Sequence, residues 1–190
     1  MKVFVSPSNK KFVDNIVIAV GGGATIDEAK IYAKKHKKRC IAIPTTAAGA
    51  TGTSHAVIWG KKKIDVKTDL PYTIILEDYP KHLPRRVLKE TIDDCTSQIY
   101  ESMKSVKRTK KSLYYAKKAA KYLAKYKAKK NLYFLRLAGH FSGCAIEITG
   151  TNIIHKMSYP LTLRGWTHGK AVGFVYRLLI SKKFPKEMWS

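Results

Sequence analysis

Short runs of apolar residues punctuate the first half of the chain. "NIVIAV" (15–20) and "CIAIP" (40–44) are rich in β-branched residues and are bounded by glycine or proline, as is typical of buried strands. "YTIILED" (72–78) has the same character and predicts a third strand.

The segment between the first two runs has a helical period instead. After "GGG" (21–23), the stretch "ATIDEAKIYAKKHKK" (24–38) places Ile26, Ala29 and Ala33 on one face and lysines on the other. Strand, glycine turn, helix and strand make a βαβ unit, so we expect a parallel sheet.

After Pro84 the apolar positions follow a helical period almost throughout. Helices are predicted over the following segments: 85–103, a basic stretch 104–130, 132–149, and 169–180. The predicted fold class is therefore an α/β part with a parallel sheet over residues 1–84, followed by an all-α part over residues 85–190.

Charge is the unusual feature of the composition. Lys and Arg number 37 against 13 Asp and Glu, a formal net charge of +24. Such a field attracts polyanions, and the segment 104–130 holds 12 basic residues and no acidic one. Nucleic acid is thus one candidate partner of this basic helix. Lysines that simply cover solvated faces are the other reading, since arginine, the usual base-reading residue, is scarce.

Cysteine usage and hydropathy bear on the compartment. Three widely spaced cysteines form no CxxC pair, so neither a disulfide framework nor a zinc knuckle is expected. No apolar run approaches the length of a membrane span. We expect a cytoplasmic protein without a membrane partner.

Two loops that follow predicted strands could bind a nucleotide. Gly21, Gly22 and Gly23 would let backbone approach a phosphate at a helix N-terminus, although glycines also serve plain βα turns. Thr45 and Thr46 end the next strand, where their hydroxyls could bond a ligand or simply cap the loop.

Two later segments could bind a metal. Asp94 and Gln98 are four apart and share a helix face, whereas Asp93 and Glu101 are interpreted as solvated charges. His155 and His168 lie in "IIHKMSYPLTLRGWTHGKAVGF" (153–174), where a break at Pro-Leu and a glycine-bounded turn would have to bring them together. Taken singly, a histidine of this kind is more often a structural or surface residue than a metal ligand.

The order of these segments carries more information than any one of them. GGGxxxD, then PTT with a small-residue loop, then a helical Asp, then H…HGxAxG resembles the iron-containing alcohol dehydrogenase superfamily, which is related to glycerol dehydrogenases and dehydroquinate synthases. The similarity runs from about Val17 to Gly173, and it implies a chain shortened at both ends relative to the family.

The resemblance implies roles for particular residues. Gly21, Gly22, Gly23 and Asp27 would hold the pyrophosphate region of NAD or NADP, and Thr45 and Thr46 would lie against the cofactor.

It also implies a site for one divalent metal, Fe²⁺ or Zn²⁺, with Asp94, His155 and His168 as ligands. Gln98 stands where the family has a further histidine, and its amide oxygen is a weaker ligand than imidazole. A carboxylate such as Asp93 would then have to complete the set.

The reaction implied is hydride transfer between nicotinamide and a small alcohol or aldehyde, with the metal polarising the substrate oxygen. The substrate could be phosphorylated, given the basic chain, and the protein could form a homo-oligomer. Two alternatives stay open: a dehydroquinate-synthase-like cyclase, and a shortened non-catalytic descendant that binds nucleotides or nucleic acid.

Overall fold

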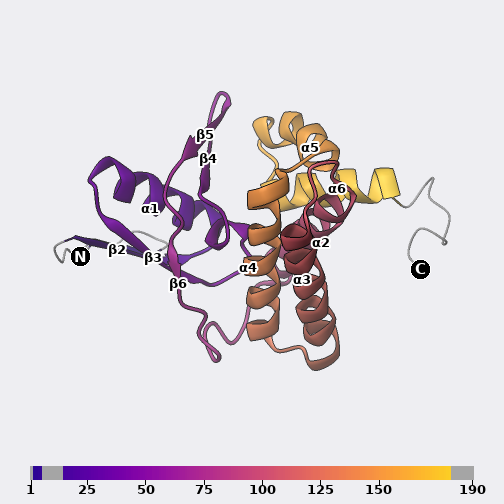
Figure 1. Cartoon of the computed structure of the whole chain (residues 1–190), viewed down its shortest axis with the longest axis horizontal. Coiled ribbons are helices and arrows are strands. Elements are labelled where there is room, and N and C mark those ends of the chain that lie inside the picture. Colours follow the sequence, from indigo (N-terminus) through magenta and orange to yellow (C-terminus); the bar gives the residue numbers. More distant parts are fainter. Residues whose placement is uncertain (1, 6–14, 181–190) are drawn as a thin grey trace.

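The computed structural model describes residues 2–5 and 15–180, and it has an α/β half beside a helical half (Figure 1). Four parallel strands form the main sheet, in the order β1 (Lys2–Val5), β2 (Ile16–Gly21), β3 (Arg39–Pro44) and β6 (Tyr72–Thr73). The expected parallel sheet followed by helices is confirmed.

Buried and partly buried residues alternate along β2 and β3, so one face of the sheet is covered. Val17 and Ala19 of β2 and Ala42 of β3 are fully buried, and they pack with Ile26 and Ala29 of α1 (Gly23–Lys35). The predicted βαβ unit is therefore present, with α1 lying over the sheet.

The third strand is shorter than predicted. Only Tyr72 and Thr73 pair with β3, with one further bond from Ile74 N to Ala42 O. The buried guanidinium of Arg136 instead bonds the carbonyls of the chain that follows, those of Leu76, Glu77 and Pro80. Arg136 thus holds this part of the chain outside the sheet, and the expectation of a strand over 72–78 is wrong beyond Thr73.

A second, two-stranded sheet was not expected from the sequence. β4 (His55–Trp59) and β5 (Lys63–Lys67) pair antiparallel as a hairpin. This hairpin rises from the α/β half alongside the helical half (Figure 1).

The helical half contains five helices among the described residues. They are α2 (Arg85–Lys104), α3 (Lys110–Lys129), α4 (Leu132–Thr149), α5 (Ile153–Leu163) and α6 (His168–Ile180). Their shared core includes Cys95, Ala119, Leu135 and Ala138, each exposed by 1% or less. None of the described helices is both long and apolar enough to cross a bilayer.

The predicted basic helix over 104–130 is in fact divided. Lys104 ends α2, and a capping box starts α3: Thr109 Oγ1 accepts from Ser112 N at 3.1 Å while Ser112 Oγ accepts from Thr109 N at 2.8 Å. This reciprocal pair satisfies two backbone donors and so fixes a new N-terminus.

The predicted break at Pro160 is also wrong, because α5 continues through it. Pro160 is exposed, so water can satisfy the carbonyl four residues earlier that the proline leaves unbonded.

The two halves meet where α4 packs against the small-residue loop 47–54. A Cβ on Gly143 would lie 2.0 Å from Gly49 O, and one on Gly139 would lie 2.3 Å from the carbonyl carbon of Ala47. A Cβ on Gly52 would lie 2.3 Å from His140 O. Backbone touches backbone here, which only glycine permits.

Glu147, near the end of α4, anchors the end of the same loop. Its carboxylate accepts from Ser54 N at 2.9 Å, from Thr53 Oγ1 at 2.7 Å and from Ser54 Oγ at 2.5 Å, with Lys67 Nζ at 3.2 Å. Burial alone would raise the pKa of Glu147, but these donors lower it to about 2.

We expect Gly143→Ala to lower the free energy of unfolding by about 1–3 kcal/mol, although alanine normally favours helix, because the methyl group would overlap the backbone of Gly49. Denaturant unfolding measures this. Gly60→Ala is the control, since a Cβ there meets nothing within 4 Å. A Gly143→Ala protein as stable as the parent would contradict the close contact.

We expect Glu147→Gln to reduce stability by about 1–3 kcal/mol at neutral pH. The folded pKa lies below the unfolded value, so the stabilisation is present above about pH 4.5 and is lost as the pH falls towards about 2. Unfolding curves of parent and variant should therefore converge over this window. The exposed Glu28, changed to Gln, should show no such pH-dependent difference.

Candidate metal and nucleotide site

The glycine turn and the threonine loop lie side by side at the carboxyl ends of β2 and β3. Thr45 N donates to Gly21 O at 2.9 Å, and a Cβ on Gly22 would lie 3.4 Å from Thr46 Oγ1. The sheet therefore brings together five of the six residues predicted to bind the cofactor.

The three glycines differ in the room that a Cβ would have at each position. A Cβ on Gly21 would lie 2.7 Å from Thr25, so internal packing alone requires glycine there. Gly22 is the N-cap of α1 and Gly23 its first residue, and a Cβ on Gly23 would have only Ala48 near it, at 3.7 Å. Gly22 and Gly23 leave the helix N-terminus approachable, which suits a phosphate.

Asp27 points elsewhere. Its Oδ2 accepts from Val57 N at 3.0 Å, and its Oδ1 lies 2.9 Å from Lys30 Nζ. Burial raises the pKa of Asp27, an effect that Lys30 partly offsets. The carboxylate thus ties α1 to the β4–β5 hairpin, and its assignment to the cofactor stays a prediction.

Lys30 is a residue that the sequence analysis did not single out. It is 1% exposed, and its ammonium donates to the carbonyls of Ala50, Thr53 and His55 at 3.0, 3.1 and 2.6 Å. Its spacing of three from Asp27 was the available signal. The Asp27–Lys30 pair holds the loop that follows the threonines.

The helical half brings the predicted metal ligands together. Asp94 Oδ1 lies 3.2 Å from His155 Nε2 and 3.8 Å from His168 Nε2. One ligand atom from each of these three residues falls within 4.8 Å of the others. α2 supplies the carboxylate, α5 one imidazole, and α6 the other at its first residue, after a turn at Gly165 with φ of +92°.

Glu101 orients His155. It is 2% exposed, so its interpretation as a solvated charge is wrong. Its Oε2 lies 2.7 Å from His155 Nδ1, and its Oε1 accepts from Ile154 N and His155 N at 2.7 and 3.2 Å. The carboxylate both caps α5 and occupies Nδ1, which leaves Nε2 to face Asp94.

Gln98 has its amide fully engaged. Its Nε2 donates to Asp94 Oδ2 at 3.0 Å, and its Oε1 accepts from Ser142 Oγ at 2.7 Å. The amide oxygen is thus held by α4, and the amide nitrogen supports Asp94. Asp93 is also turned away, because its Oδ2 bonds Arg177 Nη1 at 2.7 Å.

The pKa values of the two histidines shift in opposite directions. Burial favours neutral His155, but hydrogen bonds to Asp94 and Glu101 outweigh it and raise its pKa to about 9. Burial lowers the pKa of His168 to about 4, with the charges of His155 and Lys63 adding to the effect. The same histidine neighbours, against the effect of burial, lower the pKa of Asp94.

These donors fit a divalent metal. Two imidazole nitrogens and one carboxylate oxygen form a set that Fe²⁺ or Zn²⁺ accepts, with positions left for substrate. His168 Nδ1 is buried without a hydrogen-bond partner among the described residues.

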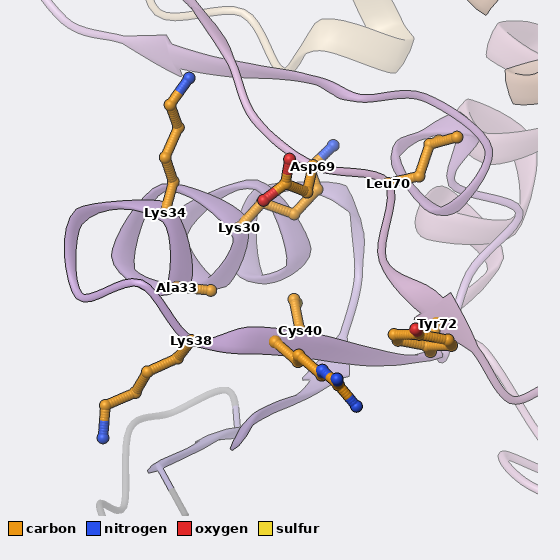
Figure 2. A pocket seen from close by; sticks show the side chains of 9 residues that line it. Lys30, Ala33, Lys34, Lys38, Cys40, Asp69, Leu70 and Tyr72 are labelled. Carbon is orange, nitrogen blue, oxygen red and sulfur yellow. The ribbon is translucent and has the colours of Figure 1, made fainter. Parts of the chain in front are cut away.

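A separate pocket of about 250 Å³ lies at the opposite edge of the sheet, where β3 and β6 begin (Figure 2). Its lining includes Lys34, Lys38, Cys40, Asp69 and Tyr72. The lysines extend to opposite sides rather than converging (Figure 2), and burial raises the pKa of the Cys40 thiol to about 11. The pocket therefore does not bring these charged and reactive side chains together as a binding or catalytic site.

The sequence is similar to that of known proteins. The family model described as iron-containing alcohol dehydrogenase matches residues 6–78. Phosphonoacetaldehyde reductase of Streptomyces viridochromogenes is 28% identical over 201 residues, which cover 84% of this chain and 51% of that protein.

The structure also superposes on solved structures of similar fold. An iron-containing alcohol dehydrogenase from Thermotoga maritima superposes with a TM-score of 0.78 at 26% identity, covering 87% of this chain and 54% of the other. Sulfoacetaldehyde reductase from Bifidobacterium kashiwanohense, solved in complex with NAD⁺, gives 0.76 at 25% identity, covering 87% and 53%. The chain spans about half the length of these relatives, and over that span it is similar to the iron-containing alcohol dehydrogenase superfamily in both sequence and fold.

Proposed function

We propose that this chain carries the metal site and part of the nucleotide site of an NAD(P)-dependent oxidoreductase. The reaction is hydride transfer between nicotinamide and a small alcohol or aldehyde. The proposal depends on one observation. Asp94, His155 and His168 each place a ligand atom within 4.8 Å of those of the other two. A relative of known structure was solved with NAD⁺, and another is named as an aldehyde reductase.

The protein's own groups prepare the site. Glu101 holds His155 in one orientation, and Gln98 donates to the Asp94 oxygen that faces away from the histidines. A divalent metal bound there would act as a Lewis acid on the substrate oxygen. Gly22 and Gly23 leave backbone N–H groups of α1 open to the cofactor phosphates.

The substrate in this proposal is a small molecule that carries an anionic group. The chain's net charge of +24 favours such a substrate. Phosphonoacetaldehyde and sulfoacetaldehyde reductases, both similar to this chain, are named for substrates of that kind.

We expect the untagged protein, reconstituted with Zn²⁺ or Fe²⁺ and freed of excess metal, to retain about one metal per chain. Asp94→Ala, His155→Ala and His168→Ala should each reduce retention to near zero, because each removes a third of the donor set. Elemental analysis gives the ratio. His36→Ala, which removes an exposed histidine, is the control. Equal retention in His155→Ala and the parent would refute the site.

We expect Glu101→Gln to weaken Zn²⁺ binding by roughly 10–100-fold, because loss of the carboxylate frees the His155 ring to rotate and lowers its basicity. Chelator competition measures the dissociation constant. Glu90→Gln, on the same helix but paired with Arg86, serves as the matched control. An unchanged constant in Glu101→Gln would show that His155 needs no orienting partner.

A further inference from the structure

The tip of the β4–β5 hairpin reaches the metal-ligand group from the α/β half. Trp59, the last residue of β4, faces Lys63, the first of β5. The Trp59 ring lies 5.4 Å from the His168 ring and 5.5 Å from the Tyr159 ring, centroid to centroid. The end of the hairpin therefore forms a wall of the site that the helical half supplies.

Lys63 presents a positive charge at this wall. Its Nζ lies 3.1 Å from Tyr159 Oη and 4.4 Å above the Tyr159 ring, so a neutral side chain holds it in place. The side chain is 24% exposed, so a ligand can reach it.

Asp65 forms only a long ion pair with this ammonium. Asp65 Oδ2 lies 3.9 Å from Lys63 Nζ, beyond hydrogen-bond distance, and Asp65 Oδ1 lies 2.8 Å from His55 Nδ1. The carboxylate of the metal-ligand group, Asp94, is already bonded by Gln98 and His155. Lys63 thus keeps the capacity for a strong, charge-assisted bond to an incoming anion.

We propose that Lys63 is a specificity-determining residue that binds the anionic group of the substrate. The substrate class is a short aldehyde or alcohol with a phosphonate, phosphate or sulfonate close to the reacting carbon. Its oxygen would face the metal ligands while its anion meets Lys63, with Tyr159 holding the ammonium. This inference rests on the proposed function, since it assumes that the reacting carbon lies at the Asp94–His155–His168 group.

The test is calorimetric binding of 2-hydroxyethylphosphonate to the Zn²⁺-loaded protein, with 2-hydroxyethanesulfonate and 1-propanol as further probes. Lys63→Met removes the charge and keeps an unbranched side chain that is one atom shorter. Lys61→Met removes an exposed charge from the same hairpin and is the matched control. Lys63→Arg tests whether charge alone restores binding. Zn²⁺ content and thermal unfolding are measured on each variant.

We expect Lys63→Met to weaken binding of both anions by about tenfold or more, while Lys61→Met and the Zn²⁺ content stay at the parental level. Lys63→Arg should recover part of the affinity. If Zn²⁺ binds and both Met variants bind the anions equally, the role of Lys63 is overturned and the proposed function stands. If the parent retains no Zn²⁺, the proposed function fails and this inference fails with it.

Discussion

Backbone contact between α4 and the loop 47–54 is the constraint on which the site depends. Gly139 and Gly143 on the helix, and Gly52 in the loop, let the two main chains approach closer than any side chain would allow. The loop leaves the threonines at the end of β3 and leads into β4, so its position sets both the nucleotide edge and the hairpin. Glu147 then fastens the end of the loop to the same helix.

The contact extends to the candidate metal ligands through one further step. A Cβ on Gly49 would lie 2.6 Å from Gln98 Oε1, so the loop packs directly on this amide. Ser142, next to Gly143 on α4, holds the amide oxygen, and the amide nitrogen holds Asp94. Loop, helix and metal ligand are therefore one packed unit, in which the two halves of the molecule share the task of orienting a carboxylate.

The sequence was sufficient for features whose signal is local. The glycine turn, the helix that follows it and the spacing of Asp94 from Gln98 all depend on neighbours in the chain, and the structure has them as expected. The order of the segments indicated the family before any geometry was available. Features that depend on distant partners were missed or misjudged: the buried Glu101 accepts from the start of α5, and the chain beyond Thr73 is held by Arg136, some sixty residues later, instead of continuing the sheet.

The β4–β5 hairpin has a consequence for how this protein could diverge. It is a separate two-stranded sheet, and Asp27 and Lys30 of α1 hold β4, whereas a Cβ added at Gly60, in the turn, would meet nothing within 4 Å. A side chain at Gly60 therefore has room without disturbing the core, whereas a change at Trp59 next to it would alter the contact with the His168 ring. A hairpin of this kind can change at its tip while the sheet and the helices that carry the candidate site residues keep their sequence.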